Sequence, residues 1–295
     1  MNGNLLVEAQ AVLDKYWEKL NHTEDEDFEA IEALQVFIEE TKDPRYMMEL
    51  GGMYYEWRRF DLALKYYDMA AEYNFEGAFE CLGYIWYYGR TGERDYKKAY
   101  ENFRKAADMG NLVAEYKLAD MHKNGYYVEK DYEKYCEIIE GMYAKVENLT
   151  MLHDPVPEIF TRLARIRTEQ GRIEEAVELY CYAKDYLAQR IAVNPFFGNR
   201  NMMNWLVNDL YKLVEFDRNN FNFFDLYYVL RQPHKVTFIY NDERYEVEAV
   251  AESGEVVVRF GEKWYRTIDD FVEKAEIDGE LMTSIWDELY LWELE

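Results

Sequence analysis

Apolar residues recur every three or four positions through most of the chain before Gln232, which is the spacing of one face of an α-helix. The first expected helix covers residues 4–20, and the second runs from a cap at Thr23 or Asp25 to about Glu40. The first helix has its apolar face at Leu5, Ala9, Leu13, Tyr16 and Leu20. The second has its apolar face at Phe28, Ile31, Leu34, Phe37 and Ile38. Later helices are expected at residues 202–215 and 222–230.

The period of the pattern changes at Gln232 and Pro233. Apolar and polar residues then alternate in four short runs, which predicts a meander of antiparallel strands. The runs are residues 235–240, 244–251, 256–260 and 264–265. A short helix after Thr267 or Asp269 should follow, and then a last helix through Leu281, Ile285, Leu289 and Leu291. The sequence thus predicts a helical domain at 1–232 and a separate small α+β module at 233–295.

One pattern is written twice between residues 78 and 142, at a spacing of 36. Asn74 and Gly110, one spacing apart, both tolerate the left-handed conformation that closes a helix. The repeated residues are Ala78, Leu82, Gly89, Asp95 and Tyr96, which recur as Ala114, Leu118, Gly125, Asp131 and Tyr132. A fixed period of this length is typical of stacked supersecondary units, none of which can bury its apolar face alone.

The repeated residues resemble those of the tetratricopeptide repeat. Leu50, Gly51 and Tyr54, followed by Ala63, Tyr67 and Ala70, match its Leu-Gly-x-x-Tyr and Ala-x-x-x-Phe-x-x-Ala pattern. Leu82, Gly83 and Trp86, followed by Ala99, Phe103 and Ala106, match it with a longer turn that resembles the related Sel-like repeat. The resemblance covers roughly residues 44–190 and makes Leu50, Leu82, Leu118 and Leu163 equivalent buried positions.

The resemblance implies a mostly α fold, an α-solenoid of about six antiparallel helix pairs before the small module. In such repeats the first helix of each pair lines a concave surface that binds proteins or peptides. The outward positions on these helices, and hence the candidate partner-binding residues, are Met48, Tyr55, Glu80, Tyr84, Tyr87, Tyr116, Asp120, Lys123, Glu158 and Arg165. Tyrosine is frequent at interface hot spots. The alternative is that these tyrosines pack between repeats.

The net charge of −25 is concentrated at the two ends of the chain. Residues 1–50 carry a net −9 and residues 233–295 a net −11, while the middle carries only −5. No basic footprint for phosphate contacts to nucleic acid is present. The ends are expected to steer a basic or polar partner to the repeat surface. An alternative function is an acidic inhibitor, either an immunity-type protein that neutralises a toxin or a nucleic-acid mimic, which binds a basic target.

The sequence contains no pattern typical of an enzyme. The histidines His22, His122, His153 and His234 are scattered, so neither a metal site nor a cofactor is expected. The cysteines Cys81, Cys136 and Cys181 form no CxxC and are expected to be buried thiols in a reducing compartment. We found neither a secretory signal nor a long apolar span, so a cytoplasmic scaffold or adaptor that contacts no membrane is expected. A third alternative makes the C-terminal module an enzyme or ligand-binding domain.

Overall fold

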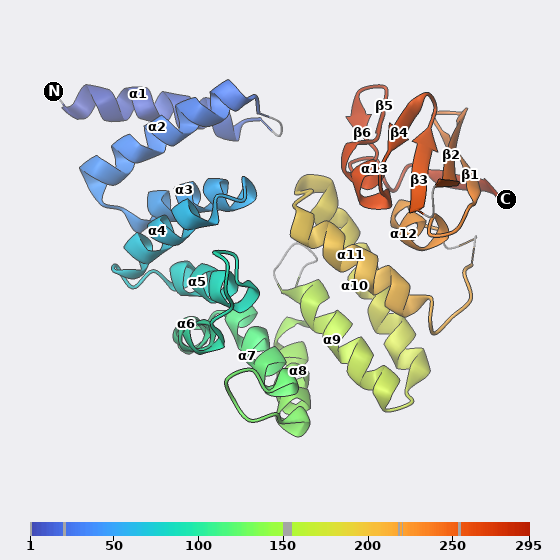
Figure 1. Cartoon of the computed structure of the whole chain (residues 1–295), viewed down its shortest axis with the longest axis horizontal. Helices are drawn as coiled ribbons and strands as arrows, with labels where there is room; N and C mark the ends of the chain where they lie inside the picture. Colours follow the sequence, from blue (N-terminus) through green and yellow to red (C-terminus); the bar gives the residue numbers. More distant parts are fainter. Residues whose placement is uncertain (1, 20–21, 150–154, 218, 220, 253–254) are drawn as a thin grey trace. The chain divides into compact units, whose positions relative to one another are not determined.

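The computed structural model describes residues 2–19, 22–149, 155–217, 219, 221–252 and 255–295. It contains two compact units, Met1–Ile138 and Ile139–Glu295. The helices of the first unit are α1 (Asn2–Trp17), α2 (Glu24–Thr41), α3 (Pro44–Glu56), α4 (Phe60–Ala71), α5 (Glu76–Tyr88), α6 (Tyr96–Asp108) and α7 (Leu112–Asn124) (Figure 1). Helix α8 (Tyr132–Val146) crosses the boundary between the units.

Successive helices of the first unit form antiparallel pairs, as the sequence predicts. Helix α1 packs on α2, α3 on α4 and α5 on α6, and each pair packs on the next. Thr23 caps α2 in a capping box with Glu26, and Asp43 caps α3 directly before Pro44. The four leucines expected at equivalent buried positions, Leu50, Leu82, Leu118 and Leu163, are all buried.

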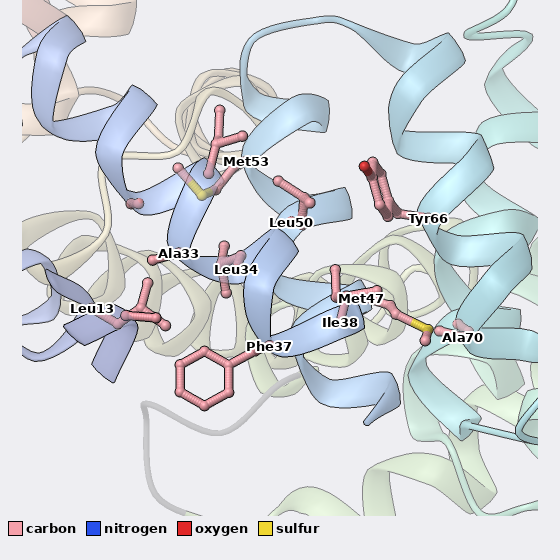
Figure 2. Close-up of a cluster of buried hydrophobic side chains, with 14 residues drawn as sticks. Leu13, Ala33, Leu34, Phe37, Ile38, Met47, Leu50, Met53, Tyr66 and Ala70 are labelled. Atoms are coloured by element: carbon pink, nitrogen blue, oxygen red, sulfur yellow. The ribbon is translucent and has the colours of Figure 1, made fainter. Parts of the chain in front are cut away.

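The core of the first two pairs is a continuous apolar cluster in which Leu13 of α1 lies near Leu34 and Phe37 of α2 (Figure 2). Two residues expected in this core are outside it. Leu5 is 50% exposed on α1, which packs on α2. Phe28 is 53% exposed and packs edge-on against Trp57, with their ring centroids 5.8 Å apart. Leu20 lies outside the described residues.

The turns after α5 and α7 have the same backbone geometry at a spacing of 36. Gly89 and Gly125 end the two helices at φ 64° and 71°, in the left-handed region where a side chain is disfavoured. The amide of Asp95 donates to the carbonyl of Trp86, and the amide of Asp131 to that of His122. Each aspartate then caps the next helix, so the sequence repeat is a repeat of structure.

After the end of α8, the second unit continues with α9 (Val156–Glu169) and α10 (Ile173–Val193), which pack as a pair. Helix α11 (Phe197–Leu210) starts and ends about one turn before the expected 202–215, and the short η2 (Phe223–Asp225) and α12 (Leu226–Val229) replace one helix at 222–230. Lys184 of α10 donates to both carboxylate oxygens of Asp225 at 3.0 Å, and both residues are buried. This ion pair ties η2 to the helix pair.

The rest of the second unit is built around a five-stranded antiparallel sheet in the order β4-β3-β2-β1-β7, in which β7 is Tyr290–Leu294. The expected meander is present as β1 (Lys235–Tyr240), β2 (Glu243–Glu252), β3 (Glu255–Phe260) and β4 (Lys263–Tyr265), followed by α13 (Ile268–Lys274), which Thr267 caps. The turn expected at residues 253–254 lies outside the described residues. One face of the sheet, with Val236, Phe238 and Val247, is buried as predicted.

The prediction of a last helix near residues 281–291 is wrong. Asp278 and Gly279 have φ of 54° and 87° and form the two-residue turn of a hairpin between β5 (Glu276–Ile277) and β6 (Glu280–Leu281). Strand β7 (Tyr290–Leu294) then pairs antiparallel with β1. The backbone groups of residues 290–294 pair with the edge of β1 that β2 leaves free. The local spacing of apolar residues could not indicate this pairing, because β1 lies far away in the sequence.

Buried contacts join this sheet region to the helices of the second unit. Arg200 of α11 is 4% exposed, and its guanidinium lies 3.3 Å from the Asp269 carboxylate and 3.0 Å from that of Glu273, both on α13. Tyr227 of α12 donates a hydrogen bond to Asp269 at 2.9 Å. The second unit therefore contains residues on both sides of the boundary expected at 232/233, and separate folding of 233–295 stays a prediction.

Candidate interaction surface

Tyr84 of α5 and Tyr116 of α7 meet across the interface between consecutive repeats. Their hydroxyl oxygens are 2.7 Å apart, and Tyr84 also packs edge-on against Phe103 of α6. Burial, followed by the proximity of Tyr116, raises the pKa of Tyr84 well above its ordinary value. Tyr116 was expected to face outward, but its side chain is only 3% exposed. It therefore supports Tyr84 and does not itself offer a surface.

Lys117 lies beneath four tyrosine rings although it carries a charge and is 5% exposed. Its Nζ is 4.7 Å from the ring centroid of Tyr84 and 5.1 Å from that of Tyr88, and it donates to the Tyr88 hydroxyl at 3.0 Å. The rings of Tyr87 and Tyr116 are each 5.3 Å away. Aromatic faces attract a cation most strongly where water is excluded, and this attraction offsets part of the cost of burying the ammonium.

Arg90 connects tyrosines of α3 and α5, as Lys117 connects α7 to tyrosines of α5. It follows Gly89, and its Nε donates to the hydroxyl of Tyr55 at 3.1 Å. Its guanidinium carbon lies 5.0 Å from the ring centroid of Tyr88 and 5.8 Å from that of Tyr55. Cations thus alternate with tyrosines from α3 to α7. We call this set the tyrosine surface and define it as Tyr55, Tyr84, Tyr87, Tyr88, Arg90 and Lys117.

Within the tyrosine surface, Tyr88 is the most open ring, at 37% exposed, while Tyr55, Tyr84 and Tyr87 are half-buried. Tyr87 also packs against Tyr88, with centroids 5.0 Å apart, and against Tyr126 at 5.9 Å. Each ring is held on one side by neighbours of its own unit. The sequence left two alternatives for these tyrosines, a partner-binding surface or packing between repeats. In the structure they pack between repeats and also stay partly accessible.

The other expected partner-binding residues of the first unit are engaged within it. Met48 is half-buried against the second and third helix pairs. Glu80 accepts a hydrogen bond from the Asn111 side chain at 2.7 Å, and Asp120 is half-buried on α7. The Nζ of Lys123 lies 4.8 Å from the ring centroid of Tyr135 on α8. These residues lie on the same helices as the tyrosine surface, and their contact with a partner stays a prediction.

Glu158 and Arg165 belong to the second unit, whereas the tyrosine surface belongs to the first. The guanidinium of Arg165 donates twice to Asp209 of α11, at 2.9 and 2.8 Å. Glu158 accepts from the guanidinium of Arg190 at 2.9 Å. Both side chains are half-buried and act in joining helices of the second unit.

Sequence reasoning missed Tyr88, Arg90 and Lys117. Tyr88 carried a signal, because it lies four residues after Tyr84 and so shares its helix face. Arg90 follows a helix end, where the direction of the side chain depends on the turn. Lys117 reads as a solvated charge in the sequence, and only the packing of α5 on α7 shows that tyrosine rings enclose it.

The acidic run at residues 24–27 is used in two ways. Glu26 completes the capping box, and hydrogen bonds from Lys19 and the Thr23 backbone lower its pKa to about 2. Asp27 accepts a hydrogen bond from the Tyr16 hydroxyl at 2.7 Å. Glu24 and Asp25 are exposed in the first turn of α2, where the helix dipole favours acids.

The described residues include no group of three or more His, Cys, Asp or Glu side chains that could hold a metal ion. His153 lies outside them. Burial raises the pKa of the Cys81 thiol to about 12, so little of it is thiolate at neutral pH. Cys181 was expected to be buried and is exposed. In the part of the chain that the structure describes, no helix is long and apolar enough to cross a membrane.

No family model matches the chain, and no curated protein matches it. Several solved structures are similar to part of it. A Sel1 repeat protein from Oxalobacter formigenes is 23% identical with a TM-score of 0.47, over 61% of this chain and 67% of that chain. The antigen c5321 of uropathogenic Escherichia coli, which has an SLR fold, is 23% identical with a TM-score of 0.42, over 63% of this chain and 37% of that one. YrrB, a TPR protein with an unusual peptide-binding site, is 18% identical with a TM-score of 0.38, over 62% and 93%.

The helix pairs α3/α4 and α5/α6 share one packing feature, a glycine against an aromatic ring. A Cβ built on Gly51 of α3 would lie 2.5 Å from the Tyr67 ring of α4, and one on Gly83 of α5 would overlap the Phe103 ring of α6. Ala99 and Ala106 of α6 are fully buried. With a glycine of the first helix beneath an aromatic ring of the second, these pairs have the stacked helix-pair fold of tetratricopeptide and Sel-like repeat proteins.

Proposed function

We propose that the chain is a non-catalytic scaffold or adaptor that binds a protein or peptide through the tyrosine surface of its first unit. The observation that carries this proposal is the alternation of half-buried tyrosines with Arg90 and Lys117 across three successive first helices. A partner that covers these rings would gain aromatic burial from side chains that already have little freedom to lose. We further propose that the protein works in the cytoplasm.

The acidic ends support the choice of partner. Glu24 and Asp25 are exposed on α2, and the chain carries a net charge of −25. Such a field speeds the approach of a basic or polar partner and slows that of nucleic acid or anionic lipid. In this proposal the tyrosines supply the contact energy, and the acids affect mainly the association rate.

The acidic-inhibitor alternative would use a different surface. Phe28 and Trp57 form an exposed aromatic pair close in sequence to Glu24 and Asp25, and they are 53% and 36% exposed. A basic target bound there would contact α2 and the end of α3. Binding that falls with Phe28→Ala or Trp57→Ala, and not with changes in the tyrosine surface, would favour this second candidate.

The proposal is tested by selecting random linear peptides, displayed on phage, against the full chain. Titration calorimetry then compares the selected peptide on the wild type and on Tyr55→Ala and Tyr88→Ala. We expect each change to weaken binding by about 1–2 kcal/mol. Tyr73→Ala is the matched control, because Tyr73 is 49% exposed and lies outside the tyrosine surface. Equal affinities for all four proteins, with the fold retained by circular dichroism, would exclude this surface.

A further inference from the structure

The hydrogen bonds of Tyr88 and Tyr55 have a defined direction. The Nζ of Lys117 is an ammonium that can only donate, so the Tyr88 oxygen accepts at 3.0 Å. The Nε of Arg90 likewise can only donate, so the Tyr55 oxygen accepts at 3.1 Å. Each hydroxyl therefore uses an oxygen lone pair internally and keeps its own proton for another acceptor.

Among the described residues, neither hydroxyl proton has an acceptor. Tyr55 and Tyr88 make no hydrogen bond beyond those from Arg90 and Lys117. Tyr84 and Tyr116 differ, because their hydroxyls share one hydrogen bond at 2.7 Å, in which one donates and the other accepts. The O–H groups of Tyr55 on α3 and Tyr88 on α5 are thus left as donors on the tyrosine surface. A bound cation next to each oxygen also polarises the O–H bond and strengthens it as a donor.

We infer that the tyrosine surface recognises hydrogen-bond acceptors, and that Tyr55 and Tyr88 donate to main-chain carbonyl oxygens of an extended segment of the partner. This inference rests on the proposed function and adds the chemistry of the contact. An extended segment offers a carbonyl at every residue, which suits single donors placed on two successive first helices. Because it is 5% exposed, Lys117 cannot reach a carboxylate itself and only fixes the polarity of Tyr88.

Acidic side chains on the same helices favour a neutral acceptor over a carboxylate. Glu80 shares α5 with Tyr88, and Asp120 shares α7 with Lys117. Both are half-buried. A carboxylate of the partner would also meet the negative field of the chain, whose net charge is −25, whereas a neutral main-chain carbonyl would not.

The test removes the hydroxyl and keeps the ring. The peptide selected on the wild-type chain is measured by calorimetry on Tyr55→Phe and Tyr88→Phe, with the exposed Tyr73→Phe as the control. We expect affinity to fall about two- to tenfold for each of the first two, the range for one neutral hydrogen bond, and not for the control. A series of the same peptide with single backbone esters, which weaken one carbonyl acceptor each, should contain positions whose effect disappears on Tyr88→Phe.

The outcomes separate this inference from the proposed function. If Tyr88→Ala weakens binding and Tyr88→Phe does not, the surface binds peptides through the ring alone and the inference is wrong. If the loss on Tyr88→Phe is cancelled by changing an Asp or Glu of the peptide to its amide, and by no backbone ester, the acceptor is a carboxylate and the inference is also wrong. If no peptide is selected on the full chain, the proposed function fails and the inference fails with it.

Discussion

Gly83 of α5 lies directly against the ring of Phe103 of α6, so close that a single methyl group on Gly83 would overlap the ring. Gly51 and Tyr67 have the same relationship one pair earlier, with a built Cβ 2.5 Å from the ring. In these two helix pairs a glycine of the first helix thus lies beneath an aromatic side chain of the second. This contact sets the distance between the two helices of a pair, and so affects the positions of the tyrosines on the first helix.

Gly83→Ala should therefore destabilise the chain although alanine is the better helix former. Overpacking costs about 1–3 kcal/mol and exceeds the gain of up to about 1 kcal/mol in helix propensity. Gly52→Ala is the matched control, because Gly52 lies in α3 beside Gly51 and a Cβ there would meet nothing within 4 Å. Urea unfolding should show a loss for Gly83→Ala and no loss, or a small gain, for Gly52→Ala. The same sign for both variants would contradict the packing described here.

The buried pair of Lys184 and Asp225 should be costly to break. Both carboxylate oxygens lie 3.0 Å from Nζ, and the two residues are 7% and 0% exposed. Lys184→Met leaves a buried carboxylate without its cation, and we expect a loss of about 3–5 kcal/mol in the free energy of unfolding. Arg104→Met is the control, because its pair with Asp108 is exposed and worth at most about 1 kcal/mol. Similar small losses for both would show that Lys184 is solvated in solution.

Alkaline pH should destabilise the protein through its buried tyrosines. Burial raises the pKa of Tyr84 well above its ordinary value and that of Tyr180 to about 12. The folded chain keeps these protons where the unfolded chain, with an ordinary tyrosine pKa of about 10, has lost them. The stabilisation is complete below about pH 10 and is lost as the pH rises through the folded-state values.

The measurement is the free energy of unfolding in urea at increasing pH, together with the ultraviolet absorbance of tyrosinate. We expect a fall in stability above about pH 10, less steep in Tyr84→Phe and unchanged in Tyr73→Phe. The contrary result would be a profile that is flat through this range or identical in all three proteins.

The cysteines should differ in reactivity in the order of their exposure. Cys181 is exposed on α10, whereas Cys81 lies in α5 and burial raises its pKa to about 12. A brief treatment with iodoacetamide near neutral pH should modify Cys181 first and Cys81 slowly, since the thiolate is the reacting form. Mass spectrometry of the digested protein measures both, and the urea-unfolded chain, where the two should react alike, is the control. Faster labelling of Cys81 would show that α5 opens readily.

Several features follow from the sequence alone because they depend on residues close together in the chain. The repeat pattern placed Leu50 and Leu82 at buried positions, and both are buried. Asn74 and Gly110 both have positive φ, as expected from their place in the 36-residue repeat. The strands of the meander likewise follow from alternation and turn residues within a few positions. Local periodicity and turn chemistry are sufficient for such elements.

Other features were decided by residues far apart in the sequence. Residues 290–294 form a strand only because β1 offers a free edge more than fifty residues earlier, so a helical spacing of leucines there was misleading. Tyr116 and Lys117 are adjacent in sequence, and both are buried because α5 packs over this part of α7. The period of a helix determines its faces, but the neighbouring helices determine how much of each face they cover. The sequence therefore determined the helix pairs and their register, while tertiary packing decided which tyrosines remain accessible and which cations hold them.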